Sequence, residues 1–302
     1  MRIFLVSSLE SKVCSRLLTL PVMRAFSAAT GIIDKEYTMR MITTRHLGTG
    51  AMSTKHKIWR RGIIDRLGAV LLGAALLSLV IAPVVEAVPK RIIILRHGEK
   101  QDAYKLCAVG QQRSLALQAN YLGKGASNSL FPGGAGPDGI FAVTLHTLEL
   151  AGPTAQSWGL PLQLYSVVPL PGLDKKAEAL QLNQRTLQAA NSVLTDPRWD
   201  GKTVVMVWEH DHIAMEKLEE QFPNEKVTLR QLLNLDTLPN VPKNWYGGNY
   251  DYFWIVDYGN PGSAMPTRFT VQKQAFPAPY EGVPSNDWGT RENLPKDSGC
   301  LP

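Results

Sequence analysis

Cysteine is scarce in this sequence, with three residues among 302, at positions 14, 107 and 300. Their number excludes a disulfide-dense scaffold, and their spacing matches no zinc-binding motif. Cys107 and Cys300 both follow the leader described below, and an exported domain is able to pair them. The alternative, which the sequence leads us to favour, is a buried Cys107 and an unpaired Cys300 close to the terminus.

A concentrated basic face is also lacking in most of the chain. The net charge is +6, yet residues 1–87 hold 12 Lys/Arg and 5 Asp/Glu, whereas residues 88–302 hold 20 and 21. Proteins that bind nucleic acid through its phosphates need clustered positive charge. We therefore expect no nucleic-acid partner. The sequence also has no internal repeat, and its apolar content is ordinary for a globular protein.

Only one long apolar run is present, at residues 67–85. A basic stretch precedes it, and Val85-Glu86-Ala87 follows with small residues where a signal peptidase cleaves, which is the pattern of a secretory signal. We expect residues 52–87 to be a signal peptide, and the protein to be exported to the periplasm or outside the cell. The run is also long enough to cross a bilayer, so an uncleaved anchor is the alternative, with the membrane as a partner only in that case.

About fifty residues precede this signal, without a core pattern. Met52 is a natural start, because residues 52–62 read as a complete basic n-region. We expect residues 1–51 to be a disordered extension or a mis-assigned start. The alternative is an organellar transit segment, since the stretch carries Arg, Ser and Thr with few acids.

Strand and helix patterns alternate after the leader. Short β-branched runs predict strands, and amphipathic stretches predict helices between them. Such alternation predicts a three-layer α/β/α domain with a mostly parallel central sheet, over residues 88–275. Residues 276–302 are rich in Pro, Gly and Asn and are expected to form a loose tail. The strands are expected at 91–95, 140–145, 162–168, 203–208 and 252–256, and the helices at 110–123, 148–158, 177–194 and 215–221.

The strongest chemical signal is Arg96-His97-Gly98-Glu99, directly after the first predicted strand. Ligands of open α/β sheets sit beyond the carboxyl ends of the strands. A neutral, fixed histidine is a nucleophile toward phosphorus, and an adjacent arginine offers a planar fork for phosphate oxygens. We expect Gly98 to allow a sharp turn and close approach to the ligand, and Gly98 and Glu99 to contact substrate.

A second cluster, Glu209-His210-Asp211-His212, directly follows the fourth predicted strand. If the two strands are neighbours, His210 meets His97 at one edge and stabilises the transferred phosphoryl group. Asp211 or Glu209 would protonate the leaving oxygen. A rival interpretation is a partial metal site, because His210 and His212 on a strand face the same way. No third ligand appears at motif spacing, so we expect neither a metal nor a cofactor.

Residues 90–215 resemble the histidine phosphatase superfamily, which includes phosphoglycerate mutase-like enzymes and acid phosphatases. The likeness rests on RHG at 96–98, GQQRSLAL at 110–117, HTLELAGPTAQSWGLPL at 146–162, and EH at 209–210. It implies the phosphoglycerate mutase-like fold, with phosphate bound by Arg96, a phosphohistidine on His97, and His210 as the second pocket histidine.

The resemblance leaves the proton donor open. In the acid-phosphatase branch an aspartate after the second histidine is the acid, and Asp211 holds that place. In the mutase branch the acid comes from another loop, where Asp174 and Glu178 are poor stand-ins. Glu209 is a further candidate.

The chain departs from the family at the second phosphate-binding arginine. That position falls on His146, which is able to donate to phosphate but not in the bidentate way of arginine. Arg113 is a candidate to compensate, and its place in a predicted helix fits a structural role equally well. Six aromatic residues near the last strand either wall a substrate pocket or pack in the core. They are Trp245, Tyr246, Tyr250, Tyr252, Phe253 and Trp254.

These observations together predict an exported phosphatase that hydrolyses phosphomonoesters of small molecules. The alternative from another class is a catalytically degenerate member that binds a phosphorylated ligand without turnover, motivated by the histidine at position 146 and the unassigned acid. A mutase acting on a glycolytic sugar phosphate fits poorly with export.

Overall fold

A computed structural model describes residues 87–172 and 174–301. The chain divides into two units, Met1–Leu77 and Ser78–Pro302, and every described residue belongs to the second. The expected extension (1–51) and apolar run (67–85) lie outside the described residues. Among the described helices, none is both long and apolar enough to cross a membrane.

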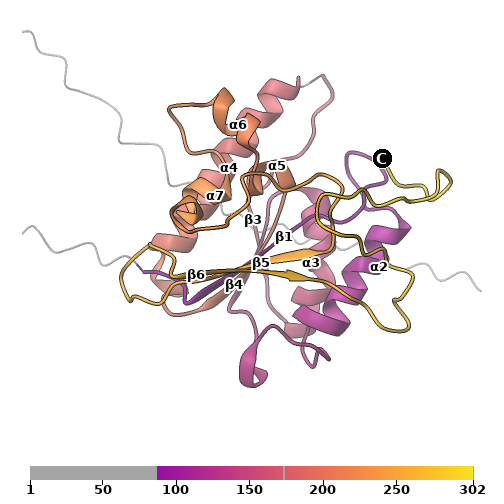
Figure 1. The fold of residues 1–302 in the computed structure, drawn as a ribbon, viewed down its shortest axis with the longest axis horizontal. Coiled ribbons are helices and arrows are strands. Elements are labelled where there is room, and N and C mark those ends of the chain that lie inside the picture. Colours follow the sequence, from indigo (N-terminus) through magenta and orange to yellow (C-terminus); the bar gives the residue numbers. More distant parts are fainter. Residues whose placement is uncertain (1–86, 173, 302) are drawn as a thin grey trace, which may run out of the picture. The chain divides into compact units, whose positions relative to one another are not determined.

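One six-stranded sheet organises the described unit, in the order β3-β2-β4-β1-β5-β6 (Figure 1). The first four strands in this order are parallel, and β5 and β6 add antiparallel pairs at one edge. The sheet is therefore mostly parallel, as predicted. The strands are β1 (Arg91–Arg96), β2 (Gly139–Ala142), β3 (Leu162–Leu164), β4 (Thr203–Trp208), β5 (Tyr252–Asp257) and β6 (Arg268–Lys273).

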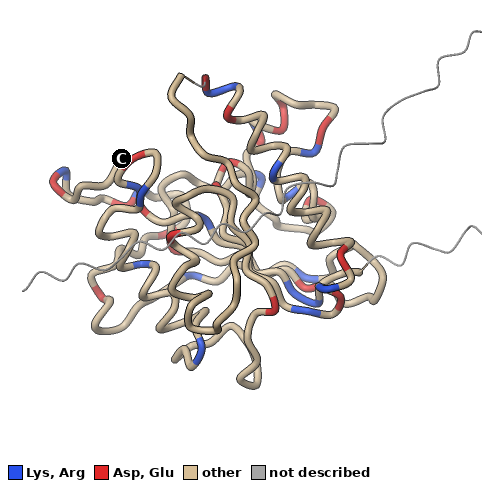
Figure 2. The backbone as a smooth tube through the Cα atoms, turned by 180° about the vertical axis from the view of Figure 1, so that it is seen from behind, with Lys and Arg blue, Asp and Glu red and all other residues tan. Residues whose placement is uncertain are grey.

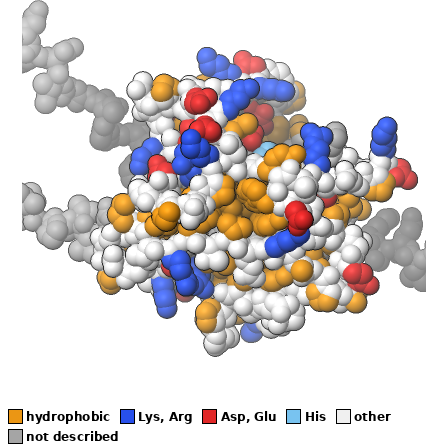
Figure 3. Space-filling view, in the orientation of Figure 1, with side chains coloured by type: hydrophobic (Ala, Val, Ile, Leu, Met, Phe, Trp, Pro, Cys, Tyr) orange, Lys and Arg blue, Asp and Glu red, His pale blue; other side chains and the backbone are white. Residues whose placement is uncertain are grey.

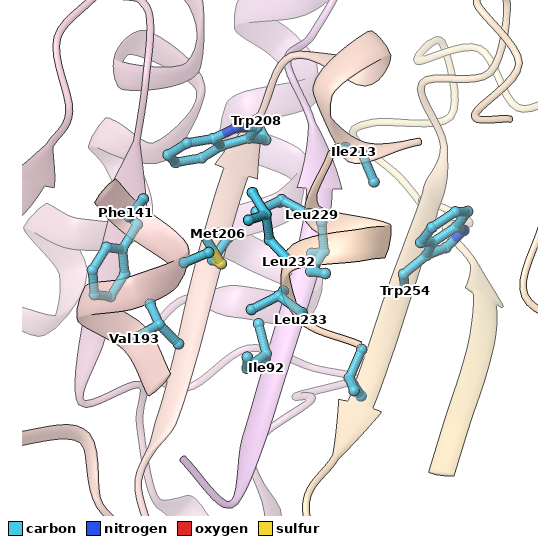
Figure 4. Close-up of a cluster of buried hydrophobic side chains, with 14 of the residues drawn as sticks. Ile92, Phe141, Val193, Met206, Trp208, Ile213, Leu229, Leu232, Leu233 and Trp254 are labelled. Carbon is cyan, nitrogen blue, oxygen red and sulfur yellow. The ribbon is translucent and has the colours of Figure 1, made fainter. Parts of the chain in front are cut away.

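The central strands are apolar on both faces because helices cover both faces. In β1, Ile92 and Ile94 pack into one buried cluster, and Ile93 and Leu95 pack into a second. Successive side chains of a strand point to opposite faces, so each cluster fills one side of the sheet. The three-layer prediction is confirmed by this arrangement. Figure 4 shows the first cluster, in which Met206 of β4 lies between Phe141 and Leu232.

The helices divide between the two faces. Leu117 of α2 and Leu150 of α3 pack in the second cluster, whereas Val193 of α4 and Leu229 of α7 pack in the first. The helices are α2 (Ala108–Leu117, continued by a π turn at Gln118–Leu122), α3 (Leu145–Trp158), α4 (Lys175–Thr195), α5 (His210–Ile213), α6 (Glu216–Gln221) and α7 (Leu229–Leu232). Short 3₁₀ turns lie at Pro132–Gly134, Pro197–Trp199 and Leu235–Thr237.

The C-terminal segment differs from the loose tail that its composition predicted. A disulfide joins Cys300 to Cys107, immediately before α2, so the expectation of an unpaired Cys300 was wrong. The backbone N–H of Leu301 also donates to the carbonyl of Lys100. Glu292 pairs with the buried guanidinium of Arg113. These three attachments hold the segment, drawn in yellow in Figure 1, beside the loop that follows β1.

Candidate active site

The neighbouring strands β1 and β4 bring two polar loops together. Arg96 pairs in register with Trp208, and the backbone N–H of His97 donates to the Trp208 carbonyl at 3.0 Å. The strands are parallel, so their carboxyl ends lie at the same edge of the sheet. The loops that begin at His97 and Glu209 therefore start side by side. They bring together His97 and His210, which are 113 residues apart in sequence.

The ring of His97 is buried and held in one orientation. Its Nδ1 lies 2.7 Å from the carbonyl oxygen of Gly98. A carbonyl only accepts hydrogen bonds, so Nδ1 carries the proton and Nε2 keeps its lone pair in the neutral ring. Burial lowers the pKa of His97 well below its usual value, and the nearby cations Lys100 and Arg96 lower it further against the opposing effect of Glu209. Nε2 is thus an unprotonated nitrogen in a fixed position, which is the state that a histidine nucleophile requires.

Three polar groups surround Nε2 of His97. Nη2 of Arg96 lies 3.0 Å away, and Nδ1 of His210 and Oε2 of Glu209 each lie 3.4 Å away. The guanidinium of Arg96 is itself fixed by donation from Nη1 to the Gly247 carbonyl at 2.6 Å, and its carbon lies 3.9 Å above the ring of Tyr250. Its buried Nε has no hydrogen-bond partner among the described residues. A guanidinium in a fixed position, with one N–H group still available to donate, therefore lies beside Nε2 of His97.

Glu209 is a buried carboxylate with several partners. Its Oε2 accepts from Nζ of Lys100 at 2.9 Å, and its Oε1 accepts from the hydroxyl of Thr144 at 2.7 Å. Burial alone would raise the pKa of Glu209, but His97, Lys100 and the Thr144 hydroxyl together hold it well below its usual value. Since His97 is neutral, the Lys100 ammonium is the main charge that keeps Glu209 ionised.

His210 opens the short helix α5 and bridges two groups. Its Nδ1 faces His97, and its Nε2 lies 3.1 Å from Oδ1 of Asp211. Burial, reinforced by Arg96, lowers the pKa of His210 to about 2, so the ring is neutral. Burial and the nearby Glu209 raise the pKa of Asp211. Of the two neighbouring carboxyl groups, Asp211 is therefore the one that more readily holds a proton.

His146 lies near this group but not in the role that the sequence predicted. Its ring centre is 6.2 Å from that of His97, and its Nε2 lies 2.8 Å from the Asp102 carbonyl oxygen. Burial and Lys100 lower the pKa of His146, so the ring is neutral and its single proton is used on Asp102. Its Nδ1 has no hydrogen-bond partner among the described residues, and Oε1 of Glu209 lies 3.9 Å away. A neutral ring in this orientation offers no donor to phosphate, and the second cation at the site is Lys100 instead.

Glu99 was expected to contact substrate, and Arg113 was a candidate either for the same or for a structural role. The structure places both outside the cavity lining. The Glu99 carboxylate accepts from Nε and Nη2 of Arg113 at 2.6–3.1 Å, with both side chains 1% exposed. Arg113 also donates to Glu292 at 2.8 Å. Charged groups this deeply buried need to be paired, and these pair with one another. They therefore join the loop after β1, helix α2 and the C-terminal segment.

Gly98 serves close packing rather than a sharp turn. Its backbone is not in the left-handed region. A Cβ atom there would lie 3.1 Å from Cδ1 of Leu150 and 3.3 Å from Cα of Gly110. The missing side chain lets the loop after β1 pack against α2 and α3.

The remaining candidates divide between packing and capping. His212 lies in α5 rather than on a strand, and its Nε2 is 2.9 Å from Oδ1 of Asn183 in α4, so it does not share a face with His210. Asp174 caps the start of α4 by accepting from the backbone of Ala177, and Glu178 lies in the first turn. The pair of metal ligands that the rival interpretation placed at positions 210 and 212 is therefore not formed.

Burial of His212 predicts that the folded protein becomes less stable as the pH falls. Burial lowers its pKa to about 4, against about 6.5 in an unfolded chain. Below about pH 6.5 the unfolded chain binds a proton that the folded chain does not, so the free energy of unfolding falls as the pH falls toward 4, by roughly 3 kcal/mol. Urea unfolding at pH 7 and pH 4.5 measures this loss. His212→Gln should show a shallower dependence, and an equal loss in both proteins would contradict the assignment.

A cavity of about 830 Å³ opens over Nε2 of His97. Arg96, Lys100 and His210 line its inner part, and Tyr246 and Tyr250 line one side. The other four aromatic residues of the predicted cluster are buried, so the cluster divides between pocket wall and core. The C-terminal segment supplies the remaining wall, from Arg291 to Leu301. Sequence reasoning had not assigned Lys100 or this wall to the site, and it had left Tyr250 open between pocket wall and core.

Two mycobacterial proteins are among the solved structures that match this chain. One is the mycobacterial glucosyl-3-phosphoglycerate phosphatase, at 14% identity and a TM-score of 0.34, covering 61% of this chain and 98% of that one. The other is described as mycobacterial hydrolase 1, at 15% identity and a TM-score of 0.34, covering 62% and 100%. No family model matches the chain, and no curated protein matches it. The functional proposal rests on the residues of the site.

Proposed function

We propose that the chain is a phosphatase that hydrolyses phosphomonoesters of small molecules through a phosphohistidine on His97. The observation that carries the proposal is the environment of Nε2, an unprotonated nitrogen at the floor of a cavity with a guanidinium at 3.0 Å and a second imidazole at 3.4 Å. Phosphoryl transfer needs in-line positioning and neutralised phosphate oxygens more than covalent work by the protein. Arg96, His210 and Lys100 supply those contacts.

The proposed reaction has two steps, transfer of the phosphoryl group to His97 and hydrolysis of the phosphohistidine. In the first, the lone pair of His97 Nε2 forms a bond to phosphorus, the bond from phosphorus to the ester oxygen breaks, and that oxygen takes a proton as the alcohol leaves. In the second, water attacks phosphorus, the bond to Nε2 breaks, and the water proton passes to the group that acted as the acid. Inorganic phosphate then leaves, and the neutral ring of His97 is restored.

Asp211 is the proposed acid, because its raised pKa lets it hold a proton that the ionised Glu209 does not. Asp211→Asn is expected to lower kcat about a hundredfold for an alkyl phosphate, whose alkoxide needs protonation. The loss for 4-nitrophenyl phosphate should be only a few-fold, because nitrophenolate leaves without a proton. Steady-state rates with both esters measure this difference. If instead kcat falls more for the alkyl ester than for the aryl ester in Glu209→Gln, and not in Asp211→Asn, the acid is Glu209.

A metal-dependent hydrolase is the second candidate, because ligand atoms of His97, Glu209 and His210 all lie within 4.8 Å of one another. Two cations oppose this use of the cluster. Arg96 lies 3.0 Å from Nε2 of His97, and Lys100 lies 2.9 Å from Oε2 of Glu209. Each of these cations would repel a metal ion bound at short range, whereas each attracts an anion. Activity that is lost on chelation and restored by one divalent metal would support the metal enzyme instead.

Export of the protein is part of the same proposal. The disulfide between Cys107 and Cys300 supports it, because structural disulfides persist in oxidising compartments. Charge supports a small-molecule substrate over nucleic acid, since Lys/Arg and Asp/Glu are interspersed along the chain (Figure 2) and over the face seen in Figure 3. Fusion of residues 52–87 to a reporter tests export, and a reporter that stays in the cytoplasm would contradict it.

Phosphate release from a panel of phosphomonoesters by the full chain tests the function. We expect turnover by the wild-type protein and by Lys175→Gln, an exposed substitution outside the cavity lining, and a large loss in His210→Ala. Binding of phosphate by the wild-type protein without release of phosphate from any ester would favour the degenerate, binding-only alternative.

A further inference from the structure

The cavity is much larger than a phosphoryl group needs. Its volume of about 830 Å³ falls in the range of sites that enclose a whole drug-sized ligand. The phosphoryl site lies at the inner end, at His97 and His210. The outer end is walled by the C-terminal segment, which the Cys107–Cys300 disulfide and the Glu292–Arg113 pair attach to the domain. The part of the substrate beyond the ester oxygen therefore meets residues of this segment.

Charge at the outer end of the cavity has one sign. Arg291 and Lys296 are exposed lining residues, and neither side chain has a hydrogen bond or an ion pair with another described residue. The inner cation, Lys100, is by contrast engaged with Glu209. Two cations on the wall are thus free to contact a ligand.

The one carboxyl group on this wall does not offset these charges. Glu292 directs Oε1 toward Arg113 at 2.8 Å, and its side chain is 4% exposed. Burial and the neighbouring Glu99 raise its pKa, so it holds a proton more readily than an ordinary glutamate. The outer cavity therefore presents the positive charge of Arg291 and Lys296, and the one carboxyl group among its described lining residues is turned toward Arg113.

We propose that Arg291 and Lys296 form a second anion subsite, and that the substrate is a phosphomonoester carrying a further negatively charged group, a carboxylate or a second phosphate, away from the scissile ester. The inference rests on the proposed function only in placing the phosphoryl group at His97. Arg291 and Lys296 determine specificity and take no part in the bond changes. A substrate that spans the cavity places its second anionic group at this wall. There the group accepts charge-assisted hydrogen bonds that a neutral substituent does not make.

Binding of two phosphonates, which are not hydrolysed, tests the subsite separately from turnover. Pentylphosphonate and 5-phosphonopentanoate have the same chain length and differ by a terminal carboxylate. Calorimetric titration of the full chain should give a dissociation constant about two- to fivefold lower for the carboxylate, the gain expected of an ion pair near the surface. The double variant Arg291→Gln/Lys296→Gln should bring the ratio of the two constants close to one. Lys175→Gln, which removes an exposed charge elsewhere, should keep the wild-type ratio.

Two results would overturn the subsite. One is a ratio near one in the wild-type protein, and the other is a wild-type preference that survives in the double variant. In both cases phosphonate binding itself would leave the proposed function standing. Failure of the protein to bind either phosphonate would overturn the phosphoryl site at His97 together with the subsite.

Discussion

Replacing His97 with alanine is expected to lower kcat for phosphomonoester hydrolysis by at least about 10⁴-fold, as loss of a nucleophile does in other enzymes with covalent intermediates. The reason is geometric. Nε2 of His97 is unprotonated and lies 3.0 Å from Nη2 of Arg96, and the ring is held in place by the hydrogen bond from Nδ1 to the Gly98 carbonyl. No covalent intermediate forms without it. Initial rates with an aryl and an alkyl phosphate measure the loss.

His210→Ala is the matched comparison for this variant. It also removes an imidazole from the cavity, and its ring lies 5.6 Å from that of His97 between centres. We expect it to reduce the rate while leaving the phosphohistidine able to form, because it removes a donor to the phosphoryl group rather than the nucleophile. Hydrolysis by His97→Ala at the wild-type rate would contradict the assignment of the nucleophile.

Replacing Arg113 with methionine is expected to lower the free energy of unfolding by about 3–5 kcal/mol. The substitution leaves the Glu99 carboxylate buried without its cation, and frees Glu292 of the C-terminal segment. Loss of one partner of a buried ion pair leaves an uncompensated charge in a medium that solvates it poorly. Urea unfolding of the oxidised protein, followed by tryptophan fluorescence, measures the change.

The double variant Glu99→Met/Arg113→Met separates pairing from packing. Removing both charges should restore much of the stability lost in Arg113→Met, since apolar side chains of similar volume replace a buried pair at little cost. A double variant as unstable as the single one would show that the pair matters through its connections to Gln274 and Pro284 instead.

The central strands were predictable because their burial on both faces leaves an unambiguous sequence pattern. The runs RIIIL and TVVMVW gave β1 and β4 to within one residue at each end. β6 was missed because it is an edge strand in which no residue is buried, with four exposed and two half-buried positions, so its sequence lacks a continuous apolar run. The helix at His210–Ile213 was missed because four residues are too few to show a helical period.

The site residues at the carboxyl ends of β1 and β4 could also be predicted from the sequence. Parallel neighbours end at one edge, so His97 and His210 were expected to meet, and their ring nitrogens lie 3.4 Å apart. The C-terminal wall was not accessible in this way. Its attachment depends on a disulfide between residues 193 apart and on the pairing of Glu292 with Arg113, and neither leaves a local pattern. Glu99 was misassigned for the same reason, because its partner lies in α2.

Mapping of phosphate on the protein after brief reaction with a phosphomonoester is the most direct test. Wild-type protein quenched in alkali, where phosphohistidine persists, should carry one phosphoryl group on the peptide that contains His97, and fragmentation should assign it to that ring. His97→Ala should carry none. Phosphate on another residue, or rapid hydrolysis by an enzyme on which no phosphoryl group is ever trapped, would contradict the proposal that Nε2 of His97 is the attacking atom.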